Sequence, residues 1–169
     1  MMKQATISVV ICTYNGAKFV AEQLDSVLRQ TRPADEIIIQ DDGSTDATLT
    51  ILRDYATRYP VIRLFQNATS MGVNANFYSA MRRAQGDFIA LCDQDDLWEA
   101  DKLERQLAAI GHQLLCGGRS VPFSEDGSFV YQDPRRPNTT ALRMMYCAEI
   151  AGHTMFFRRQ LLDLLPMDC

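Results

Sequence analysis

The hydrophobic positions along the chain alternate between short apolar runs and stretches with helical spacing. Apolar runs, most of them rich in β-branched residues, lie at 7–12, 36–40, 61–65 and 88–92. After each run, apolar side chains recur every three or four residues, as they do on one face of a helix. Because the runs are apolar nearly throughout, we expect strands that are buried on both faces. This pattern predicts an α/β fold with a mostly parallel central sheet.

The regular rhythm ends near Gly111. The segment that follows is rich in Gly, Pro, Ser and Asp, and its Asp126-Gly127 pair is typical of a hairpin turn. We expect loops and short strands there rather than another strand–helix unit. Helical spacing returns at 141–146, and the sequence "HTMFF" followed by "RRQLLDLL" predicts one more strand and a helix.

Length and composition fit one compact domain. The chain has 169 residues and a net charge of -4, which argues against nucleic acid as a partner. Its five cysteines are odd in number and include no C-x-x-C pair, as expected of a reducing compartment rather than a disulfide framework. No stretch approaches the roughly 20 apolar residues that cross a bilayer. We therefore expect a cytoplasmic protein, with peripheral association at the inner face of the membrane as a further option.

Polar clusters follow three of the predicted strands. They are "TYN" at 13–15, "DDGSTD" at 41–46 and "DQDD" at 93–96. Because open α/β sheets bind ligands at the carboxyl ends of their strands, we expect these clusters to form one site. The chain has neither G-x-G-x-x-G nor G-x-x-x-x-G-K-[ST], so a dinucleotide or a P-loop triphosphate is not expected.

Three acids crowd the end of the fourth predicted strand. Repulsion between such carboxylates is usually relieved by a cation or a proton. In an extended segment, Asp93 and Asp95 would project to the same side about 6 to 7 Å apart, close enough to share one cation. A set of oxygen donors alone favours Mg²⁺ or Mn²⁺ over zinc. We expect a metal that links these acids to a ligand diphosphate.

The acids after the second predicted strand suit a nucleoside. The carboxylates of Asp41 and Asp42 could accept hydrogen bonds from a pyrimidine N–H or from ribose hydroxyls, and Tyr14 offers a stacking face. The alternative is that Asp41 and Asp42 only form a turn and cap before the next helix. A D-x-D phosphatase or a receiver domain fits less well, because such proteins carry their acids after the first strand.

Taken in order, the motifs resemble a family-2 glycosyltransferase of the GT-A fold, and in particular its rhamnosyltransferase-like branch. The resemblance rests on "ISVVICTYNG", "EIIIQDDGSTDAT", "MGVNANFYSAMRRAQGDFIALCDQDDLWEADKLERQL" and "AGHTMFFRRQLL". It implies a Rossmann-like sandwich and an inverting, metal-dependent transfer of a sugar in cell-surface polysaccharide synthesis. The implied donor is a dTDP- or UDP-sugar, dTDP-L-rhamnose among them, and the acceptor is a saccharide or a lipid-linked acceptor.

The resemblance also implies roles for single residues. Asp95 would ligate the metal, and Asp93, which its spacing to Asp95 also makes a metal ligand, would lie near the ribose or diphosphate. The residues expected to hold the nucleotide sugar are Thr13, Tyr14, Asn15, Asp41, Asp42, Asn76 and Asp93. Asp41 is included because of its carboxylate, and the others are implied by the resemblance.

Two departures from the family pattern bear on catalysis. In similar proteins the base that removes the acceptor proton lies in an acidic motif beyond "AGHTMFFRRQLLDLLP", and here only Met167, Asp168 and Cys169 follow. Relatives often carry an acid where this chain has Cys116, Gly117 and Gly118. We therefore expect the catalytic base to be absent from this chain. A catalytically incomplete nucleotide-sugar-binding module is the alternative function.

These expectations define one domain over 1–169. Its nucleotide-sugar-binding half is expected at 1–110, and its acceptor-side half at 111–169 is expected to be incomplete at the C-terminus. His153, on an apolar segment, is interpreted as a packed histidine rather than an acid or base. The pairs Arg82-Arg83, Arg135-Arg136 and Arg158-Arg159 are interpreted as solvated, with contact to an acceptor phosphate as the alternative.

Overall fold

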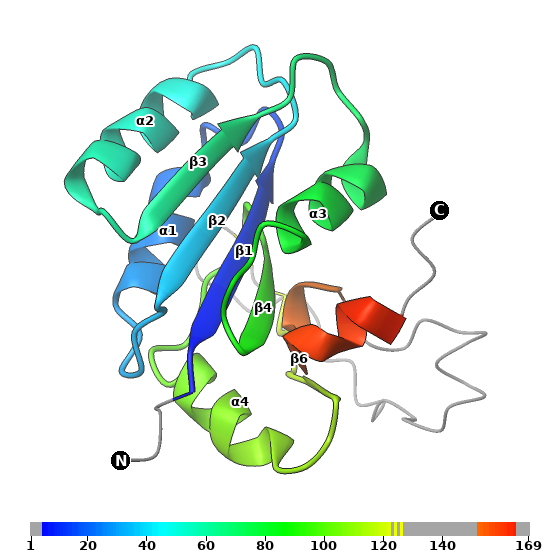
Figure 1. The fold of residues 1–169 in the computed structure, drawn as a ribbon. Helices are drawn as coiled ribbons and strands as arrows, with labels where there is room; N and C mark the ends of the chain where they lie inside the picture. The colour runs from blue at the N-terminus through cyan, green and yellow to red at the C-terminus, as the bar shows by residue number, and fades with distance from the viewer. Residues whose placement is uncertain (1–4, 123, 125, 127–151, 165–169) are drawn as a thin grey trace.

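Six strands form one sheet in the order β3-β2-β1-β4-β6-β5 (Figure 1). The computed structural model describes residues 5–122, 124, 126 and 152–164. The elements are β1 (Ile7–Thr13), α1 (Val20–Leu28), β2 (Glu36–Asp41), α2 (Thr48–Arg58), β3 (Ile62–Gln66), α3 (Val73–Met81), β4 (Phe88–Asp93), α4 (Lys102–Ile110), β5 (Leu115–Gly117), β6 (Met155–Arg158) and the short 3₁₀ helices η1 (Gly152–Thr154) and η2 (Arg159–Leu164).

Most of the sheet is parallel. Strand β1 lies between β2 and β4, β3 extends the sheet beyond β2, and all of these pairs are parallel. Strand β6 runs antiparallel to both β4 and β5. The predicted α/β architecture with a mostly parallel central sheet is therefore confirmed.

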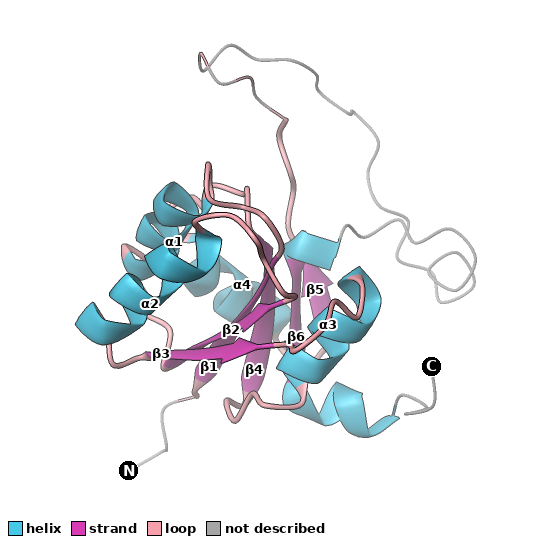
Figure 2. Cartoon of the chain, turned by 90° about the horizontal axis from the view of Figure 1, so that it is seen from above, coloured by secondary structure: helices cyan, strands magenta, loops and turns pink. Residues whose placement is uncertain are grey.

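Alternate side chains of the central strands enter two separate cores. Ile7, Val9 and Ile11 of β1 pack with α1, α2 and α4, whereas Val10 and Cys12 pack with α3 and with η2. Figure 2 shows α1, α2 and α4 on one side of the strands and α3 on the other. Because both faces are covered, the strands are apolar nearly throughout. The apolar runs in the sequence therefore reflect burial of the strands on both faces.

The later part of the chain differs from the expectation in two details. Within the segment "RRQLLDLL", Arg159–Leu164 form the 3₁₀ helix η2 rather than an α-helix, and a three-residue strand, β5, lies beside β6. The predicted hairpin at Asp126-Gly127, the predicted helix at 141–146 and the Arg135-Arg136 pair lie outside the described residues. None of the helices in the described residues has the length and apolar character needed to span a membrane.

Gly86, just before β4, leaves no room for a side chain. A Cβ there would lie 2.7 Å from the backbone nitrogen of Ser8 and 3.0 Å from the carbonyl carbon of Ile7. We expect Gly86→Ala to lower the free energy of unfolding by about 1–3 kcal/mol, because backbone atoms must move to accept the methyl group. Urea denaturation measures this change.

Gly152→Ala is the matched control, because no heavy atom of the described residues, its chain neighbours aside, lies within 4 Å of its Cβ position. Its free energy of unfolding should stay within about 0.5 kcal/mol of the parent chain. Equal destabilisation by the two substitutions would contradict the close approach of Gly86 to β1.

Candidate functional site

The turns after β1 and β2 are joined by hydrogen bonds. The Thr13 hydroxyl donates to Oδ1 of Asp41 (2.9 Å), and the Asp42 amide donates to the Thr13 carbonyl (2.8 Å). Asn15 continues the connection, because its amide donates to Oγ of Ser44 (2.9 Å) and its Oδ1 accepts from the Thr45 amide (2.8 Å). Two of the predicted polar clusters therefore form one rigid unit.

Asn15 has a left-handed backbone, with φ of 49°. Asn tolerates this conformation better than most residues other than Gly. The turn it makes aims the side-chain oxygen at the turn after β2. The residue type at position 15 is thus explained by local geometry as well as by any ligand.

Gln94 brings the third cluster into the same unit. Its Oε1 accepts from the Tyr14 amide (2.8 Å) and its Nε2 donates to the Tyr14 carbonyl (3.1 Å). A Cβ at Gly16 would lie 2.3 Å from Oε1 of Gln94, so this pairing depends on a glycine there. The three polar clusters that follow β1, β2 and β4 thus meet at one edge, as the sequence predicted.

Asp41 is fully buried and serves the turn that follows it. Its carboxylate accepts hydrogen bonds from the Thr13 hydroxyl, from the Ser44 amide (2.9 Å) and from the Ser44 hydroxyl (2.5 Å). None of its surface is exposed. In this conformation Asp41 has no exposed surface for a nucleotide, and its hydrogen bonds support the turn after β2. Its assignment to the nucleotide sugar stays a prediction from the sequence.

Asp42 holds the loop between β3 and α3. Its Oδ1 accepts from Nδ2 of Asn67 (2.6 Å) and from the Met71 amide (2.8 Å), and its Oδ2 accepts from Oγ of Ser70 (2.7 Å) and the Gly72 amide (2.9 Å). Burial opposes ionisation of this carboxyl. The four hydrogen bonds outweigh burial and lower the pKa of Asp42.

Asn76 lies on the inner side of α3 and is also committed to the protein. Its Oδ1 accepts from Asn67 (2.8 Å) and its Nδ2 donates to the Gln40 carbonyl (3.0 Å). Only 2% of its surface is exposed. In this conformation Asn76 supports the loop from Asn67, and its contact with ribose or phosphate of the donor stays a prediction from the sequence.

At the end of β4, two acids and a histidine come together. One ligand atom each from Asp93, Asp96 and His153 lies within 4.8 Å of the others, the described residues alone being considered. His153 Nδ1 lies 3.4 Å from Oδ2 of Asp93. Among the described residues, Oδ2 of Asp96 and Nε2 of His153 are buried and have no hydrogen-bond partner.

The charges of this cluster depend on one another. The hydrogen bond with Asp93 raises the pKa of His153, although burial acts in the opposite direction. Burial raises the pKa of Asp96, and the negative charge of Asp93 adds to this effect while His153 opposes it. Lys102 lies close by, with its ammonium 3.8 Å from the centre of the Trp98 ring, and burial lowers its pKa. Two buried atoms without partners, in a set of oxygen and nitrogen donors, fit a divalent cation.

Asp95 does not share this position. The strand ends at Asp93 and the chain turns at once through Gln94 and Asp95, so the extended backbone assumed for Asp93 and Asp95 does not continue. Asp95 is exposed, and Asp96 takes its place in the cluster. The assignment of Asp95 as a metal ligand stays a prediction from the sequence.

His153 and Gln94 were missed by sequence reasoning. Strand β6 pairs antiparallel with β4, with Ala90 opposite Phe156. The 3₁₀ helix η1 directly precedes β6 and contacts β4, and it carries His153 to Asp93. The apolar sequence "HTMFF", placed as an antiparallel strand beside the fourth predicted strand, could have indicated that His153 lies near Asp93. Gln94 carried no comparable pattern, because an amide in a turn has many local uses.

Known proteins resemble this chain over most of its length. A family model described as "Glycosyl transferase family 2" matches residues 8–165. TuaG of Bacillus subtilis (strain 168), named as a candidate teichuronic acid biosynthesis glycosyltransferase, is 40% identical over 131 residues, which are 75% of this chain and 48% of TuaG. The chain spans between 30% and 48% of the lengths of curated relatives that match it at 37% to 41% identity.

Solved structures agree with the fold. The crystal structure of S. aureus TarS 1–349 in complex with UDP-GlcNAc has a TM-score of 0.70 and 28% identity, and the match covers 94% of this chain and 46% of that chain. The mannosyltransferase PcManGT from Pyrobaculum calidifontis, solved with GDP-Man and Mn²⁺, has a TM-score of 0.72 at 24% identity and covers 99% of this chain and 49% of that one. The mannosyltransferase likeness supports the fold alone.

Proposed function

The chain belongs to glycosyl transferase family 2, and from this premise we propose that its carboxyl edge binds a nucleoside diphosphate sugar whose sugar passes to an acceptor hydroxyl. One observation carries the proposal. Three turns that are distant in the sequence are joined by Gln94 and Asn15 around the cluster of Asp93, Asp96 and His153. Such an edge suits a ligand with a nucleoside at one end and a diphosphate at the other.

Each turn has a proposed task. Tyr14 is 52% exposed and is proposed to stack on the base, while Thr13 and Asn15 hold the turn that presents it. Asp42 is proposed to serve the nucleoside through the loop that it anchors. Direct contact between Asp42 and a base would require the ligand to replace one of its four present hydrogen bonds.

The diphosphate end of the donor is assigned to the acids after β4. Asp93 and Asp96 with His153, or Asp93 with Asp95 by the D-x-D pattern, would hold Mg²⁺ or Mn²⁺. A bound cation of this kind supplies positive charge to the leaving nucleoside diphosphate. The interlocked turns contribute by fixing the acids and the base-stacking ring before the donor arrives, so little ordering remains to be done on binding.

The finer points of the reaction belong to the proposal as well. The donor is a dTDP- or UDP-sugar, L-rhamnose being one candidate sugar, and the acceptor is a saccharide or lipid-linked acceptor of a cell-surface polysaccharide. TarS solved with UDP-GlcNAc and the assignment of TuaG to teichuronic acid biosynthesis support this direction. Inversion follows from the family resemblance. A cytoplasmic location, with association at the inner face of the membrane as an option, is proposed from the cysteine usage of the chain. A single domain with a nucleotide-sugar-binding half over 1–110 is the matching organisation.

A second candidate is a module that binds the nucleotide sugar without transferring it. The chain spans less than half of the length of TuaG, and none of the described residues is identified as the base that removes the acceptor proton. Incubation with UDP-sugars, dTDP-sugars and Mn²⁺ separates the two candidates. Release of UDP or dTDP supports a transferase, whereas binding without release supports the module.

The first test of the shared proposal is thermal stabilisation. UDP-GlcNAc with Mn²⁺ should raise the unfolding temperature of the chain, because a ligand that binds only the folded form stabilises it by mass action. A panel of UDP-, dTDP-, GDP- and ADP-sugars identifies the base in the same assay. If no nucleotide sugar shifts the transition with or without Mn²⁺, the proposed function is wrong for this chain.

Asp95→Asn and Asp96→Asn decide between the two donor sets. Both substitutions remove one carboxylate charge from neighbouring residues, so each is the control for the other. Loss of Mn²⁺ dependence confined to Asp96→Asn supports the set with His153. Loss confined to Asp95→Asn supports the D-x-D pair.

A further inference from the structure

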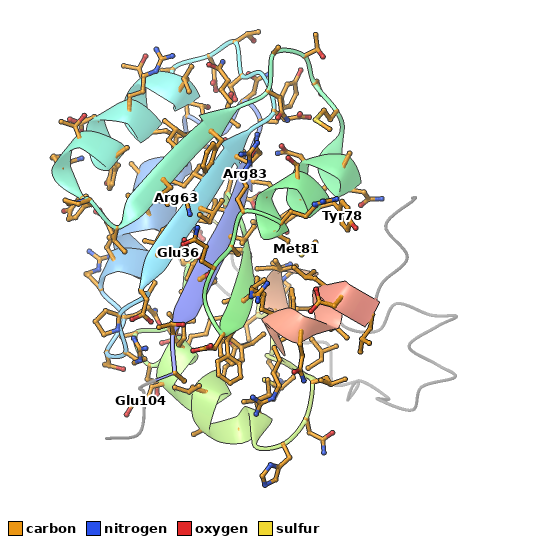
Figure 3. The ribbon with its side chains drawn as sticks, in the orientation of Figure 1. Glu36, Arg63, Tyr78, Met81, Arg83 and Glu104 are labelled. Atoms are coloured by element: carbon orange, nitrogen blue, oxygen red, sulfur yellow. The ribbon has the colours of Figure 1, made fainter. Side chains whose placement is uncertain are left out.

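Four arginines line an open pocket on the α3 side of the sheet. The pocket has a volume of about 490 Å³, and its lining residues are Arg63, Arg82, Arg83, Ala84, Gln85 and Arg159. They come from β3, from the segment that follows α3 and from the start of η2. Figure 3 shows Arg63, Arg83 and Glu36 in front of β2 and β3, beside α3. In a chain of net charge -4, this concentration of positive charge is local.

The pocket lies at the opposite edge of the sheet from the proposed nucleotide site. Arg63 is the second residue of β3, and Gln85 comes shortly before β4, so both lie at the amino ends of parallel strands. Arg159 follows β6, whose antiparallel direction brings it to the same end. The Asp93 cluster is at the carboxyl end of β4. A ligand of the pocket is therefore separate from the nucleotide sugar.

We propose that this pocket binds a phosphate group, either of a soluble phosphate or of a phospholipid headgroup. Guanidinium groups recognise phosphate through paired N–H donors, and several of them together hold a dianion. The proposal goes beyond the proposed transferase function, because no part of the donor site contributes to it.

Two of the arginines are held in place by the protein. Arg63 donates to Oε2 of Glu36 (3.0 Å), and Arg83 donates through Nε to Oε1 of Gln40 (3.1 Å). Their guanidinium carbons lie 5.5 and 4.2 Å from the centre of the Phe65 ring. These contacts fix two of the donors beforehand and reduce the ordering that binding requires.

The positive charges of the other two arginines are not paired with an acid among the described residues. Arg82 and Arg159 are exposed, and neither forms a salt bridge with another described residue. Among the described residues, Glu36 is the one acid that forms a salt bridge with an arginine of the pocket, and that arginine is Arg63. Among the described residues, four guanidinium groups of the pocket have one carboxylate paired with them, so an anion is the ligand that the pocket suits.

The test uses the 169-residue chain with Arg82→Gln and Arg159→Gln combined. Neither side chain forms a salt bridge with another described residue, and the double variant leaves the partners of the Arg63–Glu36 and Arg83–Gln40 contacts unchanged. Inorganic phosphate and pyrophosphate are titrated at low salt and followed by heteronuclear NMR. We expect saturable shifts of the amides around Arg82 to Gln85 and Arg159 in the parent chain. The double variant should bind about tenfold more weakly or worse.

The matched control combines Arg29→Gln and Arg53→Gln. Both are exposed arginines of the helical layer on the other side of the sheet, so the control loses the same charge and should bind phosphate as the parent does. Asp93→Asn should also retain phosphate binding, which separates this proposal from the transferase function. Equal loss in both arginine double variants, or no saturable binding of any probe, overturns the proposal.

Vesicles distinguish the two sources of phosphate. Phosphatidylcholine vesicles with added phosphatidylglycerol are compared with phosphatidylcholine alone in a co-sedimentation assay. Binding to the anionic vesicles that falls in the Arg82→Gln, Arg159→Gln variant identifies a lipid headgroup. Binding of free phosphate with no vesicle binding identifies a soluble phosphate compound.

Discussion

Asp93→Asn should lower the Mn²⁺-dependent affinity of the chain for UDP by about 100-fold or more. The substitution removes a carboxylate that both proposed donor sets contain. It also removes the ionic partner of His153, whose Nδ1 lies 3.4 Å from the Asp93 carboxylate. Outer partners of metal ligands typically account for about 10- to 100-fold in metal affinity, so loss of a donor itself should reach the top of that range.

Isothermal titration of UDP with and without Mn²⁺ measures this effect. Asp54→Asn is the control, because it makes the same chemical change on the exposed surface of α2, where Asp54 pairs with Arg58 at 2.6 Å. The control should bind UDP like the parent chain. An Asp93→Asn variant with unchanged Mn²⁺-dependent affinity would show that the diphosphate is not held at the end of β4.

The fold was predictable because its causes are local and repeated. Strands β1, β2 and β4 are buried on both faces, so each appears in the sequence as a run that is apolar nearly throughout. Strand β5 has three residues, and its partner β6 lies far along the chain. A strand that short leaves no periodic pattern, and its pairing depends on contacts between distant segments.

The candidate site was predictable in place but not in detail. Parallel strands bring their carboxyl ends to one edge, so the meeting of three polar clusters followed from the strand predictions. The choice of Asp95 assumed an extended backbone, whereas the chain turns directly after Asp93. The occupied carboxylates of Asp41 and Asp42 could not be foreseen either, because their donors come from loops whose conformations the sequence pattern does not specify.

Asp42→Asn should lower the free energy of unfolding by about 3 kcal/mol or more. The carboxylate accepts four hydrogen bonds, two of them from the backbone amides of Met71 and Gly72. The Asn side chain has the same shape but carries an NH₂ group in place of one carboxylate oxygen. That group would face N–H or O–H groups that now donate to Asp42, so at least one of those groups would be buried and unpaired. Hydrogen bonds to a charged group contribute about 1.5–3 kcal/mol, and an unpaired buried donor costs about 1–3 kcal/mol.

The effect of Asp42 on stability should also depend on pH. Its hydrogen bonds lower the pKa below the ordinary value of 3.8, so the ionised form is favoured in the folded chain. The stabilisation is therefore fully present above the unfolded-state pKa and is lost as pH falls through the lower folded-state pKa. Urea denaturation of both chains from neutral pH downwards measures it. The difference in unfolding free energy between parent and variant should be constant near neutrality and shrink only in strong acid. A difference that shrinks already at neutral pH would mean that the Asp42 carboxyl is not held ionised by the loop from Asn67 to Gly72.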